Sequence, residues 1–165
     1  MGVELSQLMT LIGYNFRDHQ LLFNALKHRS YVYAFEQSGI ESNERLEFLG
    51  DAVLDLLVAE YLFRNFTDKR EGELTQMKSL VVSRQVLARK AEEISLGEFV
   101  LLSDEERSSG GGQQRSILCD TFEALIGAIF LDGGIKPCRH FIHNYVLNDL
   151  DELMLRDDYI NFKSK

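Results

Sequence analysis

Apolar residues recur at the period of an α-helix along nearly the whole chain. They fall three or four positions apart from Leu5 to Leu153, and one proline and twelve glycines give few breaks. No segment shows the sustained alternation of apolar and polar residues that marks a half-buried strand. The pattern therefore predicts an all-α fold. The expected helices cover about residues 5–12, 19–26, 44–66, 71–82, 84–91, 116–131 and 137–153.

Polar and small residues predict where these helices begin and where the chain turns. Asp18 and Ser83 are residue types that accept hydrogen bonds from the first turn of a helix, and the pair Ser42-Asn43 precedes the long central helix. The aromatic segment 31–39 is expected to be a loop, and the glycine-rich segment 108–112 to be a flexible one. Both loops are interpreted as connections inside one domain.

Composition sets limits on the class of protein. With 165 residues, 45% of them hydrophobic and 27% charged, the chain is expected to form one domain with a sizeable core. No apolar run approaches the roughly 18 residues of a membrane span, and the start lacks a signal-peptide pattern. Cys119 and Cys138 have no metal-binding spacing and do not indicate an oxidising compartment, so a cytoplasmic protein is expected. The net charge of −8 is unusual for a nucleic-acid binder, although clustered acids account for part of it.

Three carboxylates lie on one face of the long helix expected after Asn43. Glu44, Glu47 and Asp51 are three and four residues apart, and at about 100° per residue they project within a narrow sector. The leucines and the valine of the same segment gather on the opposite side. Like charges one turn apart repel by a few tenths of a kcal/mol per pair, so this face favours a bound cation.

A second acidic pair lies on the apolar helix expected over residues 116–131. Asp120 and Glu123 are three residues apart and share a face, which the small residues Ala124, Gly127 and Ala128 surround. Small residues would let a neighbouring helix approach closely. Two such helices could share a cation site, and all-oxygen ligands select a hard ion such as Mg²⁺ or Mn²⁺.

Other interpretations of these acids stay open on spacing alone. Acids on helices are commonly solvated, and Asp55, one turn beyond Asp51, is expected to be solvated or ion-paired. A di-iron carboxylate bundle would place a glutamate three residues before a histidine, and none of the four histidines has one. An all-α nucleotide pyrophosphohydrolase would keep its acid pairs closer in sequence than Glu47 and Asp120. Cys119 has no histidine beside it and is interpreted as a packed small residue instead of a nucleophile.

Four segments, in order along the chain, resemble the ribonuclease III family. The strongest is Asn43-Glu44-Arg45-Leu46-Glu47-Phe48-Leu49-Gly50-Asp51, continued by Ala52-Val53-Leu54. The others are the opening segment 11–30, the acidic segment Glu71-Gly72-Glu73-Leu74, and the helix from Ser116 to Ala128 with its Cys119-Asp120-Thr121-Phe122-Glu123 core. The resemblance covers essentially residues 5–150.

The resemblance implies roles for individual residues. Glu47, Asp51, Asp120 and Glu123 match the metal-binding catalytic acids of the family, and cleavage depends most on the positions of Asp51 and Glu123. Glu44 and Glu71 match accessory acids of the family that support metal, RNA or dimer contacts. Phe48 matches a residue that enters a pocket of the partner subunit, with a buried core phenylalanine as the alternative.

The resemblance also implies an activity and an organisation. The family consists of homodimeric endonucleases that use Mg²⁺, with Mn²⁺ as a substitute, to cut double-stranded RNA. The products carry 5′-phosphate and 3′-hydroxyl ends with a short 3′ overhang, and ribosomal and messenger RNA precursors are the expected substrates. Residues 1–155 are expected to form the catalytic domain and 156–165 to begin a linker toward a double-stranded RNA-binding domain. A module that binds RNA without cutting it, and a purely structural helical dimer, are the competing function classes.

Overall fold

The structure is a computed structural model that describes residues 2–35 and 37–163. Within these residues all of its secondary-structure elements are helices, and one isolated bridge between Lys27 and Leu101 is its sole β-type pairing. The all-α prediction is therefore confirmed. No helix in the described part of the chain is long and apolar enough to cross a membrane. The α-helices are α1 (Gly2–Ile12), α2 (His19–Ala25), α3 (Arg29–Ala34), α4 (Glu44–Asn65), α5 (Glu71–Val81), α6 (Arg84–Glu93), α7 (Asp104–Ser108), α8 (Arg115–Gly133), α9 (Ile135–Tyr145) and α10 (Leu150–Lys163).

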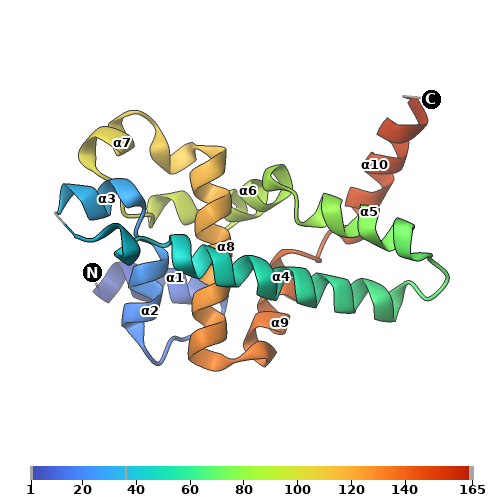
Figure 1. The fold of residues 1–165 in the computed structure, drawn as a ribbon, viewed down its shortest axis with the longest axis horizontal. Coiled ribbons are helices and arrows are strands. Elements are labelled where there is room, and N and C mark those ends of the chain that lie inside the picture. Colours follow the sequence, from blue (N-terminus) through green and yellow to red (C-terminus); the bar gives the residue numbers. More distant parts are fainter. Residues whose placement is uncertain (1, 36, 164–165) are drawn as a thin grey trace.

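Two long helices, α4 and α8, cross at the centre of the molecule (Figure 1). Helices α2, α6 and α9 pack against α8, and α5 returns along the C-terminal half of α4. The core between them is built from fully buried side chains such as Leu54 and Val58 of α4 and Phe122, Leu125 and Ile129 of α8. The crossing therefore fixes how the first half of α4 faces the first half of α8.

Glycines bring the backbones of α4 and α8 into contact at the crossing. A Cβ atom on Gly50 would lie 1.7 Å from the carbonyl oxygen of Glu123, and one on Gly127 would lie 2.3 Å from that of Leu46. Real side chains do not approach this closely, so no larger residue fits at either position. The expectation that small residues near residue 127 admit a neighbouring helix is confirmed.

Most of the predicted helix starts are confirmed, but Asn43 works differently from a cap. The side chains of Asp18 and Ser83 accept hydrogen bonds from the first turns of α2 and α6. Asn43 is buried and its Nδ2 donates to the carbonyl of Ala25 at 3.0 Å and to the Thr121 hydroxyl at 3.4 Å. This amide therefore ties the start of α4 to α2 and α8 instead of capping α4. The Ser42 hydroxyl accepts a hydrogen bond from the Glu44 N–H at 3.4 Å, so the cap expected from the pair Ser42-Asn43 is supplied by Ser42.

Two sequence predictions of secondary structure were wrong. The segment expected to be a loop over 31–39 contains most of α3, which begins because the His28 side chain accepts a hydrogen bond from the Ser30 N–H. The helix expected over 137–153 is broken between Tyr145 and Leu150. In addition, the segment 108–112 is shorter as a loop than predicted, since it lies between α7 and a 3-10 turn over Gly111–Gln113.

A buried lysine explains the break between α9 and α10. Lys90 of α6 is 1% exposed, and its ammonium donates to Asp149 at 2.6 Å and to Asn148 at 3.0 Å. A buried charge needs such partners, and a continuous helix would have carried these two side chains elsewhere. Helix α10 then extends to Lys163, so the expected linker is helical from 156 to there, while residues 164–165 lie outside the described residues.

Candidate active site

The acids of α4 and α8 line a single cleft of about 990 Å³ at the crossing of the two helices. The start of α6, helix α3 and residues just before α8 form its other walls. Hydrogen-bonding side chains, including Arg29, Ser30, Gln114 and Ser116, lie around the acids. Six acids share this cleft: Glu44, Glu47 and Asp51 from α4, Glu106 from α7, and Asp120 and Glu123 from α8.

The crossing sets the carboxylates of one helix against those of the other. Burial, and next the charge of Asp120 and a hydrogen bond to it, raise the pKa of Glu47 to about 7. Burial, and next the charge of Asp51, raise the pKa of Glu123 to about 7. Both shifts follow from packing several carboxyl groups in a half-buried site that contains too little positive charge. The cleft is therefore an environment in which a cation would be stabilised.

Arg84 supplies a positive charge to this cleft. Its Nη1 donates to Oδ1 of Asp120 at 3.1 Å, and the Asp120 carboxylate is the main cause that raises the pKa of the guanidinium. Sequence reasoning missed this residue. A signal was present, because Arg84 is the first residue of α6, where the helix dipole disfavours a cation.

Cys119 touches the catalytic candidate Glu123. Its Sγ lies 3.4 Å from Oε1 of Glu123, and burial raises the pKa of this thiol well above its usual range. A buried, protonated thiol is a poor nucleophile, so Cys119 acts as a packed small residue, as predicted, and also as a weak donor to Glu123. The hydrogen bond itself was not expected from the sequence.

Three other residues singled out in the sequence, two acids and one phenylalanine, lie outside the acid cluster or at its edge. Glu71 lies at the start of α5, where it accepts a hydrogen bond from the Thr75 hydroxyl at 2.9 Å and lines a separate groove with Phe63. It does not reach the cleft of its own chain.

Asp55 is half-buried. Its pKa is raised by burial first and then by the charge of Asp51, with the Lys78 ammonium acting in the opposite direction. Phe48 is 82% exposed beside the cleft, so the alternative of a core phenylalanine was wrong.

The donor set of the cleft fits a hard divalent cation. Carboxylate oxygens are the ligands that Mg²⁺ and Mn²⁺ prefer, and in the described residues neither Glu47 nor Glu123 forms an ion pair. Among residues 2–35 and 37–163, no three acid, cysteine or histidine side chains converge as a ready ligand group. The contacts of Asp120 with Arg84 and of Glu123 with Cys119 point two of the candidate ligands toward other partners. Side-chain rotation at the cleft would therefore accompany metal binding.

A family model and the curated relatives of this chain point to the same protein family. The family model described as Ribonuclease-III-like matches residues 18–150. Ribonuclease 3 of Fusobacterium nucleatum is 40% identical over 161 residues, which cover 98% of this chain and 69% of that protein. Ribonuclease 3 of Pelotomaculum thermopropionicum is 42% identical over 159 residues, covering 94% of this chain and 66% of that protein. The chain thus spans about two thirds of the length of these relatives.

Solved structures give the same result. The nuclease domain of ribonuclease III from Campylobacter jejuni superimposes with a TM-score of 0.79 at 40% identity, covering 85% of this chain and 94% of that chain. That structure is described as showing flexibility in a region involved in dimer formation. A second structure of the same nuclease domain also gives a TM-score of 0.79, at 39% identity, covering 87% of this chain and 94% of that chain.

Proposed function

This chain belongs to the ribonuclease III family of double-strand-specific endoribonucleases, and we propose that it hydrolyses double-stranded RNA at the acidic cleft with the help of Mg²⁺. The observation that carries the proposal is that Glu47, Asp51, Asp120 and Glu123, from two helices distant in sequence, line one cleft. Metal dependence is a property of the family. Mg²⁺ is proposed because the candidate ligands are all carboxylates, and Mn²⁺ is expected to substitute.

The same four acids would bind the metal, and the other residues of the cleft would contact the RNA. When bound, divalent ions supply an activated water at neutral pH and stabilise the leaving oxygen of a phosphodiester. Glu47 and Glu123 must lose their protons to serve as ligands, so binding of the cation and release of protons are coupled. We propose 5′-phosphate and 3′-hydroxyl products, and precursors of ribosomal and messenger RNA as substrates.

The charge of the chain makes the contact with RNA sensitive to salt. Arg29 and Arg84 line the cleft, but the whole chain carries a net charge of −8. Contacts from lysine and arginine to phosphates dominate the affinity for nucleic acids. The affinity that these contacts supply falls as the salt concentration rises. Double-stranded RNA is recognised mainly by its shape and its 2′-hydroxyl groups, so little sequence preference is expected.

An RNA cleavage assay tests the proposed function. A labelled RNA duplex of a few tens of base pairs is incubated with the protein at low salt, with Mg²⁺, with Ca²⁺ or with a chelator. We expect discrete shorter products with Mg²⁺, none after chelation, and none from a DNA duplex of the same sequence. RNA that stays intact in every lane but is retarded in a binding gel would instead support a non-cleaving binding module.

We further propose that the enzyme is a homodimer joined along α4. An apolar stripe of exposed residues follows this helix, and at about 100° per residue its members fall within roughly one quadrant. Its largest members, Phe48 and Phe63, are 82% and 73% exposed, which is unusual for side chains of this size. The stripe consists of Phe48, Ala52, Leu56, Ala59 and Phe63.

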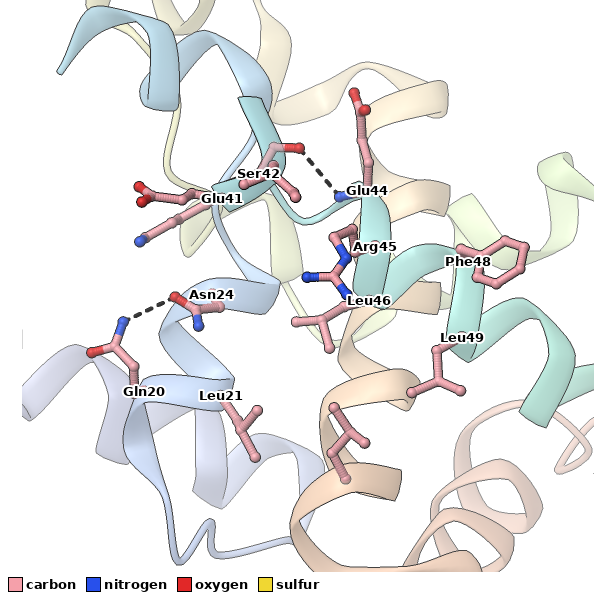
Figure 2. Close-up of a pocket in the computed structure, with 13 residues that line it drawn as sticks. Gln20, Leu21, Asn24, Glu41, Ser42, Glu44, Arg45, Leu46, Phe48 and Leu49 are labelled. Atoms are coloured by element: carbon pink, nitrogen blue, oxygen red, sulfur yellow. Dashed lines mark hydrogen bonds between the residues drawn. The ribbon is translucent and has the colours of Figure 1, made fainter. Parts of the chain in front are cut away.

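A hollow beside Phe48 is suited to receive the same residue of a second copy. Figure 2 shows Leu21 of α2 and Leu46 and Leu49 of α4 in this pocket, with Phe48 at its edge. Ile40 and, from α8, Leu131 complete its apolar lining, and its volume is about 1000 Å³. In a two-fold symmetric dimer each Phe48 can enter the pocket of the other subunit, because residue and pocket belong to the same patch.

Truncation of Phe48 is expected to weaken the dimer. In Phe48→Ala the apolar anchor is lost, and a central anchor of this size contributes about 2 kcal/mol or more, so the dimer dissociation constant should rise about 30-fold or more. Sedimentation equilibrium over a range of protein concentrations measures it. Leu11→Ala, which truncates an exposed apolar residue of α1, is the control and should leave the constant unchanged. An unaltered dimer in Phe48→Ala would contradict this arrangement.

A further inference from the structure

The ion pair of Arg84 has a place in the cleft that structural stability does not explain. Within residues 2–35 and 37–163, it is the only ion pair that involves one of the six cleft acids. The Arg84 side chain is 58% exposed, and exposed pairs contribute at most about 1 kcal/mol to stability. Asp120, its partner, is one of the four candidate metal ligands.

The backbone at Arg84 is fixed while its side chain is lightly held. Ser83 caps α6 by accepting a hydrogen bond from the Val86 N–H, and α6 packs against α8, so the Cα of Arg84 has a defined position at the cleft wall. A guanidinium has five N–H donors, and in the described residues Arg84 makes one hydrogen bond, to Asp120. The group can therefore rotate to another acceptor within the cleft without any change in the fold.

A guanidinium and a divalent cation compete for the same carboxylate. Asp120 cannot serve both fully, because a dication beside Arg84 would be repelled by its charge. An RNA phosphate, which the cleft must accept if it cuts RNA, offers two oxygens that match the planar fork of arginine. From its position, Arg84 can donate to the Asp120 carboxylate in the metal-free protein and to an RNA phosphate in the complex with RNA.

We propose that Arg84 is a displaceable counterion of the acidic cleft, which neutralises Asp120 in the metal-free protein and binds the RNA phosphate once a divalent ion occupies Asp120. The phosphate-binding half of this proposal rests on the proposed function. The exchange makes the two ligands cooperative, because RNA that engages Arg84 frees Asp120 for the metal. By linkage, metal bound at Asp120 equally favours RNA at Arg84.

Two variants separate the counterion role from the phosphate-binding role. Without RNA, Arg84→Gln is expected to bind Mn²⁺ about three- to tenfold more tightly than the wild type, as measured by isothermal titration calorimetry, because a nearby positive charge is removed. With saturating Mn²⁺, the same variant should cleave duplex RNA at least about tenfold more slowly in single turnovers, since a charged hydrogen bond to phosphate is lost. Arg84→Lys keeps the charge and should show wild-type Mn²⁺ affinity with intermediate cleavage.

Matched controls and contrary results complete the test. Arg89→Gln lies on the same helix and removes an arginine paired with Asp149 outside the cleft, so neither Mn²⁺ affinity nor cleavage should change. Equal or weaker Mn²⁺ binding by Arg84→Gln would overturn the counterion role, and unchanged cleavage would overturn the phosphate role. If the wild type binds Mn²⁺ but cuts no RNA, the proposed function fails together with the phosphate role, while the Mn²⁺ affinities still decide the counterion role.

Discussion

Replacement of Glu123 by glutamine is expected to lower cleavage of duplex RNA by at least about a hundredfold while the fold and the dimer persist. Glutamine has nearly the same shape, so the packing of α8 against α4 is kept. The charge that faces Asp51 and would hold a cation is removed. Changes to the outer partners of metal ligands already cost about 10- to 100-fold in affinity or activity, and loss of a direct ligand should cost more.

Single-turnover cleavage with Mg²⁺ and with the enzyme in saturating excess over the RNA gives this comparison directly. Asp55→Asn is the matched control, since it removes a carboxylate on α4 that lies outside the cleft, and it should cleave at close to the wild-type rate. Sedimentation and thermal unfolding verify that both variants are folded dimers. Cleavage by Glu123→Gln within a few-fold of the wild type would remove Glu123 from the proposed catalytic set.

Replacement of Gly127 by alanine is expected to destabilise the protein by several kcal/mol. The added Cβ would lie 2.3 Å from the carbonyl oxygen of Leu46 and 3.1 Å from the backbone nitrogen of Gly50. Both neighbours are backbone atoms of α4, so the clash cannot be relieved by a rotamer change and the helices must separate. Overpacking of a core typically costs about 1–3 kcal/mol, and a rigid backbone contact lies at or above the upper end. Separation would also move Glu47 and Asp51 away from Asp120 and Glu123.

Urea unfolding followed by circular dichroism measures the loss. A domain of ordinary stability has about 5–15 kcal/mol in total, so Gly127→Ala should shift the unfolding midpoint strongly or leave the chain partly unfolded. Gly72→Ala is the control, because nothing lies within 4 Å of a Cβ at that position of α5. Alanine is the better helix former by about 1 kcal/mol, so this variant should be as stable as the wild type or more so. Equal midpoints for the two variants would show that α4 and α8 separate easily.

Local spacing in the sequence was sufficient to predict the acidic faces. The period of a helix determines that Glu44, Glu47 and Asp51 share one side of α4, and that Asp120 and Glu123 share one side of α8. The small residues around Gly127 predicted that another helix passes close by, and the cation site suggested for the two acidic helices is consistent with α4 being that helix. These features depend on neighbours in the sequence or on a long apolar helix, which are the most reliable signals.

Features that depend on distant partners could not be predicted in this way. The break between α9 and α10 places Asn148 and Asp149 where they accept hydrogen bonds from the buried ammonium of Lys90, which lies about 60 residues earlier in the chain. The contact of Arg84 with Asp120 depends on how α6 packs on α8, which periodicity does not specify. Helix α3 was missed because it is a short element of six residues with a histidine cap. The supporting role expected for Glu71 stays a prediction, since it lies apart from the cleft of its own chain.

Helix α4 has consequences for how this enzyme can evolve. One side carries carboxylates, another is buried in the core, and a third presents the apolar stripe, with Gly50 pressed against α8. On the proposed roles, a substitution on almost any side of this helix is expected to damage catalysis, folding or subunit pairing, and selection should remove it. New substrate preferences would have to arise elsewhere, in the walls that α3 and the residues before α8 contribute to the cleft. We expect those segments to change more readily than α4.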